Sequence, residues 1–209
     1  MAKHLVAAQL YVFSQHYGQQ KKTLEDNLGE ALADVAAAGF EGVEGNLSFA
    51  GTPEKAERLK GLLAKNRLRL AGLFHGGVYH EREQAEKTVA EMRQLAPLAR
   101  QVGCTLIDVN PGVKRGAPKT DDELAVQGEY LDKVGAVLRE QGLTFVTHNH
   151  TPEILNGARE TRSNLRLTKP ENMALCVDTH WVLRGGESPI GLLREWGSRV
   201  KALHLRNST

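Results

Sequence analysis

The chain has 209 residues, of which 41% are hydrophobic and 25% are charged, and its formal net charge is +2. This length and composition suit a globular fold with a sizeable core, and we expect a single domain over residues 1–209. So small a net charge argues against nucleic acid or a membrane surface as a partner, and no apolar run is long enough to span a bilayer.

The chain opens on an apolar run at residues 5–13, which we expect to be a strand. Because no signal-peptide-like segment precedes this run, we expect a cytoplasmic protein. Further short apolar runs predict strands at 40–45, 68–74, 104–109, 143–147, 173–177 and 200–205. Helical spacing and helix-start residues predict helices at 23–38, 53–66, 81–102, 120–141, 159–167 and from Pro189 onward. The two cysteines, Cys104 and Cys176, fall inside predicted strands, so we expect both to be buried and reduced.

Strands and helices that alternate at this spacing are typical of repeated βα units. The strands are apolar throughout, as in parallel sheets that are covered on both faces. A doubly wound sheet is the competing α/β architecture, but Gln9, Leu10 and Tyr11 stand where its glycine-rich phosphate loop would follow the first strand. We therefore predict a (β/α)8 TIM barrel with seven strands in this chain, its eighth strand and last helices missing.

Polar side chains gather just past the predicted strands, where the active site of a TIM barrel lies. The residues at these strand ends are Gln9, Tyr11, Glu44, Asn46, His75, Asn110, His148, Asn149, His150, Glu153, Asp178, His180, Trp181, His204 and Arg206. Each of them alone has a structural explanation, such as a turn at Asn110 or packing at Tyr11 and Trp181. Together on one rim, they predict an active site.

Three of these residues form a candidate metal site. Glu153, Asp178 and His204 supply two carboxylates and an imidazole, which suit one Mn²⁺, Mg²⁺, Co²⁺ or Zn²⁺ ion and leave positions open for substrate oxygens. A metal ion chelated by a hydroxy-ketone acidifies the C–H bond next to the carbonyl, and a carboxylate can then remove the proton. The remaining imidazoles and Arg206 would hold hydroxyl groups or stabilise the enediolate oxygen.

Residues 149–153 read Asn-His-Thr-Pro-Glu, and they resemble the Asn-His-x-x-Glu motif of one subgroup of the xylose isomerase-like TIM barrels. This superfamily comprises sugar phosphate isomerases and epimerases. Supporting matches are Gln9-Leu10-Tyr11, residues 39–44, residues 178–182 with 184–186, Arg199-Val200 and His204-Leu205-Arg206. The resemblance covers nearly the whole chain.

The resemblance implies one divalent metal ion bound by Glu153, Asp178, His204 and a last glutamate on strand eight, a strand that we expect to be missing here. It also implies that Glu153 is a base as well as a ligand. The family often has Lys-Asp after the His-Leu of strand seven, where this chain has Arg206-Asn207. Because a guanidinium is a planar fork rather than a point charge, we expect Arg206 to orient substrate oxygens. We further expect a homo-oligomer that covers the open edge of the barrel.

We accordingly expect a metal-dependent sugar or sugar-phosphate isomerase or epimerase that acts on a small carbohydrate. Glu153, His180 and Arg206 are its predicted catalytic residues. The predicted substrate-binding residues are Gln9, Tyr11, Glu44, His75, Asn110, His148, His150 and Trp181. Two alternatives stay open: a dehydratase of an inosose or keto-sugar that uses the same site, and a non-catalytic sugar-binding protein. The DNA-repair branch of the superfamily fits least, because Trp181 stands where its metal cluster requires a histidine.

Overall fold

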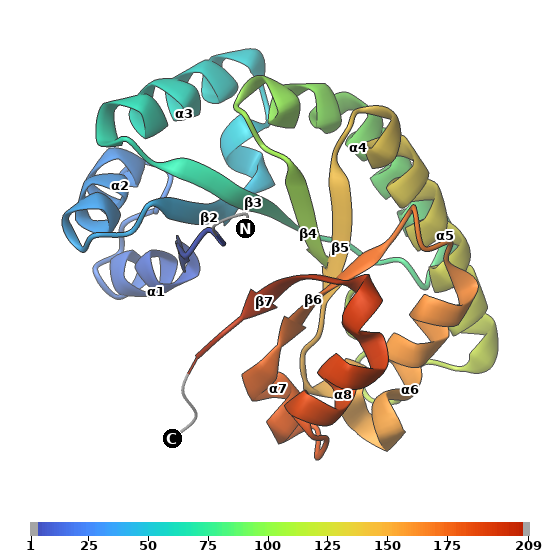
Figure 1. Ribbon diagram of the computed structural model, residues 1–209. Helices are drawn as coiled ribbons and strands as arrows, with labels where there is room; N and C mark the ends of the chain where they lie inside the picture. The colour runs from blue at the N-terminus through green and yellow to red at the C-terminus, as the bar shows by residue number, and fades with distance from the viewer. Residues whose placement is uncertain (1–3, 207–209) are drawn as a thin grey trace. The chain divides into compact units, whose positions relative to one another are not determined.

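The computed structural model describes residues 4–206 and consists of two compact units. The first unit contains the chain up to His75 together with Gln94–Ile107, and the second contains Gly76–Arg93 together with the chain from Asp108 onward. Seven strands alternate with helices along these residues, and the order of the strands in the sheet is their order in the chain (Figure 1). The prediction of seven strands in an α/β fold is confirmed.

The first unit is built on three parallel strands. Its elements are β1 (Ala7–Gln9), α1 (Tyr11–Gln19), α2 (Leu28–Ala37), β2 (Gly42–Asn46), the short helix η1 (Leu47–Ala50), α3 (Pro53–Asn66) and β3 (Arg69–Gly76). β1 pairs with β2, and β2 pairs with β3. Helix α2 packs against α3, and their buried side chains are leucine, valine and alanine at helical spacing.

The second unit carries the carboxyl ends of four strands. Helix α4 (Arg82–Gln101) and strand β4 (Leu106–Asn110) each begin in one unit and end in the other. The elements after them are α5 (Asp121–Glu140), β5 (Thr144–His148), α6 (Thr151–Leu167), β6 (Ala174–Asp178), α7 (Thr179–Arg184), α8 (Pro189–Trp196), η2 (Gly197–Arg199) and β7 (Val200–His204). Strand β6 pairs in parallel with β5 and with β7, and α5 packs against β5 and α6.

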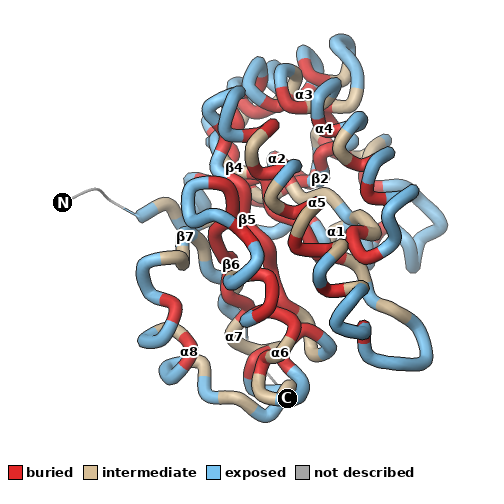
Figure 2. Tube along the Cα trace, turned by 90° about the vertical axis from the view of Figure 1, so that its right-hand side faces the viewer, coloured by how far each residue is buried: buried red, intermediate tan, exposed pale blue. Residues whose placement is uncertain are grey.

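The core of the second unit centres on β5 and β6. All five residues of β6 are buried, as are all residues of β5 except Thr144 (Figure 2). Helix α5 begins at a capping box in which Thr120 accepts from the Glu123 amide and the Glu123 carboxylate accepts from the Thr120 amide. The predicted N-terminus of this helix is therefore confirmed. No helix in residues 4–206 is long and apolar enough to cross a membrane.

The expected strand at residues 5–13 is wrong beyond Gln9. Tyr11 does not end a strand but begins α1, and its side chain is 65% exposed. The turn starts where the Phe13 amide donates to the Leu10 carbonyl. Short apolar runs do not distinguish a strand from a helix, because both bury them equally well. The run therefore divides into a three-residue strand and a helix.

Two helical segments at the carboxyl ends of strands escape prediction from the sequence. α6 begins at Thr151 rather than at residue 159, with Pro152 in its first turn, and it is interrupted at residues 155–158. Asn156 and Ala158 there have φ angles of 56° and 54°. α7 was not expected at all. α7 starts directly after β6, and two residues separate the end of β5 from the start of α6, so both helices fix side chains at the strand ends.

Candidate active site

The second unit brings four strand ends together, and each ends on a polar residue. Asn110, His148, Asp178 and His204 are the last residues of β4, β5, β6 and β7. Asp178 is paired with His204 across the β6–β7 register, which places them side by side. Asn110, His148 and Asp178 are buried, and the His204 side chain is 11% exposed. Because parallel strands end at one edge of a sheet, these side chains share a site.

Asp108 lies at the centre of this site and was missed by sequence reasoning. Its carboxylate is buried, with Oδ2 3.0 Å from His148 Nδ1 and 3.6 Å from His204 Nε2. It stands two residues before Asn110, so both side chains leave β4 on the same face. A carboxylate inside an otherwise apolar strand was the available signal, since buried charges occur where they have partners.

A third imidazole, that of His150, extends this cluster. The Nε2 atoms of His148 and His150 lie 3.4 Å apart, and their rings meet edge to face with centroids 4.8 Å apart. Burial, with a further contribution from His148, lowers the pKa of His150 to about 4. His150 is therefore neutral at physiological pH. When Asp108 accepts a hydrogen bond from His148 Nδ1, the His148 Nε2 atom is left as an acceptor toward His150.

Glu153 is held at the start of α6 with one oxygen engaged. Its Oε2 accepts a hydrogen bond of 2.8 Å from the His150 amide. Its Oε1 is buried and has no hydrogen-bond partner among residues 4–206. Burial, together with repulsion from Glu160, raises the pKa of Glu153 above its usual value. A carboxylate whose pKa is raised in this way, and which keeps one oxygen without a hydrogen bond, is suited to accept a proton.

Asp178 is fixed by the helix that follows it. Its Oδ1 accepts from the Trp181 amide at 3.0 Å and so caps α7, while Oδ2 lies 3.4 Å from Arg206 Nε. The Arg206 guanidinium lies over the Trp181 ring, 4.6 Å from its centroid. Asn149, the first residue of the Asn-His-x-x-Glu motif, holds β5 to β6: its side-chain amide donates to the Asp178 carbonyl, and its Oδ1 accepts from the Asp178 amide, each at 3.1 Å.

The predicted residue His180 lies beside this group. Its ring packs against Trp181, with the ring centroids 4.9 Å apart, and Trp181 also meets His150 edge to face. In the described part of the chain, His180 Nδ1 is buried without a hydrogen-bond partner. The second unit therefore brings together the predicted residues Asn110, His148, His150, Glu153, Asp178, His180, Trp181, His204 and Arg206.

The other predicted residues belong to the first unit. Gln9 and Glu44 are register partners on β1 and β2, and the Gln9 amide donates to Glu44 Oε1 at 3.3 Å. His75 lies near the end of β3 and is half-buried, and Tyr11 lies on α1. Substrate binding by these four residues stays a prediction.

A buried ion pair between Lys119 and Glu160 lies close enough to Glu153 to act on its carboxylate electrostatically. Lys119 Nζ donates to the Gly112 carbonyl at 2.5 Å, to Gln127 Oε1 at 2.7 Å and to Glu160 Oε1 at 2.6 Å. The Lys119 side chain is 2% exposed, and that of Glu160 is 10% exposed. This network ties the segment after β4 to α5 and α6.

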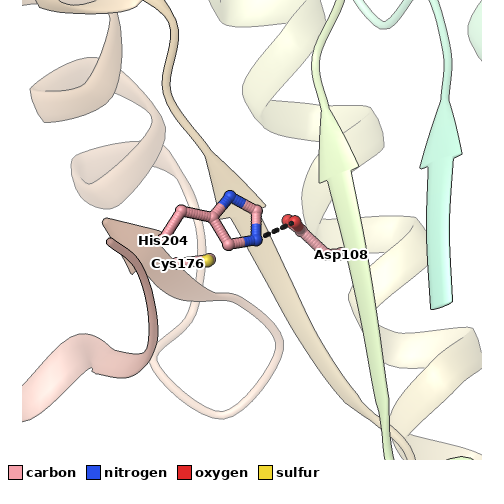
Figure 3. Close-up of side chains that lie close together, drawn as sticks. All are labelled: Asp108, Cys176 and His204. Atoms are coloured by element: carbon pink, nitrogen blue, oxygen red, sulfur yellow. Dashed lines mark ion pairs between the residues drawn. The ribbon is translucent and has the colours of Figure 1, made fainter. Parts of the chain in front are cut away.

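The donor set of Glu153, Asp178 and His204 suits a hard or borderline divalent ion, since it offers two carboxylates and an imidazole. Within residues 4–206, however, the ligand atoms that already lie within 4.8 Å of one another belong to Asp108, Cys176 and His204 (Figure 3). The ligand atoms of Glu153, Asp178 and His204 are thus not the set that lies closest together. Metal binding by these three residues stays a prediction.

A family model described as a xylose isomerase-like TIM barrel matches residues 32–209. The chain belongs to this family. The match continues through both compact units. The family assignment made from the Asn-His-x-x-Glu motif is confirmed.

Individual relatives agree with this assignment. The chain is 25% identical over 191 residues to an inosose dehydratase of Geobacillus kaustophilus, covering 85% of this chain and 61% of the relative. It superposes on a sugar phosphate isomerase/epimerase from Parabacteroides distasonis with a TM-score of 0.79 and 16% identity, covering 99% and 76% of the two chains. For the probable 3-DHS dehydratase AsbF from Bacillus anthracis the TM-score is 0.75 and the identity 17%, covering 98% and 73%. At these identities, the solved structures show a shared fold.

Proposed function

We propose that this chain is part of a carbohydrate-active enzyme that removes a proton from the carbon next to a carbonyl group, and that residues 1–209 act as one domain. The observation that carries the proposal is Glu153, a buried carboxylate with a raised pKa and with one oxygen, Oε1, that has no hydrogen-bond partner within residues 4–206. The other oxygen, Oε2, accepts from the His150 amide at the start of α6. A buried acceptor of this kind costs stability, and function is the usual reason for such a cost.

The neighbouring side chains divide the remaining tasks. Glu153 Oε1 would take the proton from carbon. Arg206, a fixed positive charge over Trp181, would orient a substrate oxygen and stabilise the charge that develops on it. His150, neutral at physiological pH, would exchange a proton with a substrate hydroxyl and pass it along the contact to His148. We propose that Trp181 and His180 form the wall against which the carbon skeleton packs.

Glu153, Asp178 and His204 would hold one divalent ion, Mn²⁺, Mg²⁺, Co²⁺ or Zn²⁺. Such an ion, when bound, polarises the carbonyl group and acidifies the adjacent C–H bond. Arg206 would then have to share Asp178 Oδ2, from which its Nε lies 3.4 Å away. The side chains that move protons are the same whether the ion is Mn²⁺ or Zn²⁺.

Two reactions follow from this first step. Return of the proton to carbon gives an isomerase or epimerase, which is supported by the likeness to the Parabacteroides isomerase/epimerase. Loss of a hydroxyl group from the next carbon gives a dehydratase. The dehydratase fits at least as well, because the relative at 25% identity is an inosose dehydratase. The substrate class in either case is a polyhydroxylated cyclic or open-chain ketone.

The test is proton exchange in D₂O. The protein is incubated with Mn²⁺ and with an inosose or a ketohexose, and deuterium at the carbon next to the carbonyl is followed by NMR. Exchange without loss of water indicates the epimerase, and an α,β-unsaturated ketone or its tautomer indicates the dehydratase. We expect Glu153→Gln to slow exchange by about 10²–10⁴-fold, the usual contribution of a general base. Glu140→Gln, which alters an exposed residue at the end of α5, is the matched control. Exchange at the wild-type rate in Glu153→Gln would refute Glu153 as the base.

A further inference from the structure

Cys176 lies in the interior of the candidate site, two residues before Asp178 on β6. Both side chains leave β6 on the same face, because they are two residues apart on a strand. Cys176 and Asp108 are each 1% exposed. Figure 3 shows the Cys176 sulfur beside the His204 ring, with the Asp108 carboxylate on the other side of that ring's Nε2. Sequence reasoning treated this cysteine as a small core residue, but two metal-ligating side chains lie close to its sulfur.

We propose that Asp108, Cys176 and His204 form a second metal-binding position, selective for a thiophilic divalent ion such as Zn²⁺ or Cd²⁺. The three ligand atoms already lie within 4.8 Å of one another. Ligands of a tetrahedral zinc ion, with bonds of about 2.0–2.3 Å, stand about 3.3–3.8 Å apart. The Asp108–His204 separation of 3.6 Å falls inside that range. The sulfur therefore has to move by about 1 Å at most to complete the set, which a change of one side-chain torsion supplies.

The chemistry of the three donors sets the selectivity. A thiolate, an imidazole and a carboxylate suit Zn²⁺, whereas Mn²⁺ and Mg²⁺ prefer oxygen ligands. On binding, the Cys176 S–H bond breaks, the sulfur–metal bond forms and the proton is released to solvent. His148 already contacts Asp108 Oδ2 at 3.0 Å, so it would orient the ligating carboxylate from outside.

His204 belongs to both positions, and this has a consequence for control of the enzyme. One imidazole nitrogen binds one ion at a time, so an ion held by Cys176 withdraws His204 from Glu153 and Asp178. Zn²⁺ and Cd²⁺ are therefore expected to compete with Mn²⁺ for His204. This competition rests on the proposed function, whereas binding of a thiophilic ion by Cys176 does not.

Cobalt absorption tests the binding directly. Co²⁺ is titrated into the reduced protein, and thiolate coordination is detected as a sulfur-to-cobalt charge-transfer band in the near ultraviolet. We expect the band in the wild type and in Cys104→Ser, which removes the other buried cysteine, and expect its loss in Cys176→Ser. Added Zn²⁺ should bleach the band. Cys176→Ala serves as a second variant, and circular dichroism checks that each variant is folded.

Three outcomes would overturn the proposal: no charge-transfer band in the wild type, a band that persists in both Cys176 variants, or a band that Cys104→Ser abolishes. Asp108→Asn should weaken the Co²⁺ affinity by about 10-fold or more, and an unchanged affinity would remove Asp108 from the site. Glu153→Gln separates this proposal from the preceding one, since it should keep the cobalt band and lose proton exchange.

Discussion

Replacement of Lys119 by methionine is expected to destabilise the second unit strongly. Lys119 Nζ makes three short hydrogen bonds, to Gly112 O, Gln127 Oε1 and Glu160 Oε1, and its side chain is 2% exposed. Methionine fills nearly the same volume but donates no hydrogen bond. The change therefore leaves Glu160 as a buried carboxylate without its cation, while the carbonyl of Gly112 loses its donor.

The magnitude follows from the burial of the pair. Removal of one partner from a buried ion pair costs about 3–5 kcal/mol, because the remaining charge loses its compensation. Gln127 Nε2 still donates to Glu160 Oε1 at 3.0 Å, so we expect the lower end, about 3 kcal/mol. For a chain of this size, that loss lowers Tm by about 6–12 °C.

Tryptophan fluorescence in urea is the suitable assay. The chain has two tryptophans, and both Trp181 and Trp196 lie in the second unit with Lys119. Their emission therefore reports the unfolding of the unit that contains the substitution. The urea concentration at the unfolding midpoint is compared between the wild type and Lys119→Met, as is the slope of the unfolding free energy against urea concentration. This slope should stay constant if only stability has changed.

A double-mutant cycle supplies the control. In Lys119→Met/Glu160→Met neither charge is present, so the double variant should be more stable than Lys119→Met alone, by about 1 kcal/mol or more. Two results would refute the reasoning that the buried Lys119 and Glu160 charges compensate each other. One is a loss of unfolding free energy below about 1 kcal/mol in Lys119→Met, and the other is a double variant less stable than Lys119→Met.

Three further predictions concern packing, pH and association. Gly135→Ala should cost about 1–3 kcal/mol, since its new Cβ would overlap the Asn172 carbonyl. In Gly61→Ala the new Cβ meets no atom of residues 4–206 within 4 Å, so the change should stabilise α3 by up to about 1 kcal/mol. Thermal unfolding measures both effects. Because the pKa of His150 is about 4 in the folded state, against an ordinary value of 6.5, the unfolded chain binds a proton first as the pH falls. The stability of the metal-free wild type should thus fall between pH 6.5 and 4 more steeply than that of His150→Gln, and parallel urea midpoints across that range would contradict this. Among residues 4–206, β7 is an edge strand of the sheet, and its Leu203 is 44% exposed. We therefore expect the chain to self-associate through this edge and Leu203→Lys to shift sedimentation toward the monomer.

Local patterns in the sequence were enough to predict the alternation of strands and helices and the family. The start of α5 follows from Thr120 and Glu123, because a capping box satisfies orphan amides with residues three apart. The strand-end histidines and carboxylates follow from the apolar runs that precede them. Each of these features depends on residues that are neighbours in the chain.

Only the tertiary structure decided which side chains meet. Asp108 comes from β4, Cys176 from β6 and His204 from β7, and no local pattern links residues so far apart in the chain. The helical start of α6 was equally hidden, because it depends on Glu153 reaching back to the His150 amide after a strand has fixed that amide in place. Spacing along the chain predicts which face of an element a residue occupies, whereas register between strands sets the distances of a few ångströms on which metal binding and proton transfer depend.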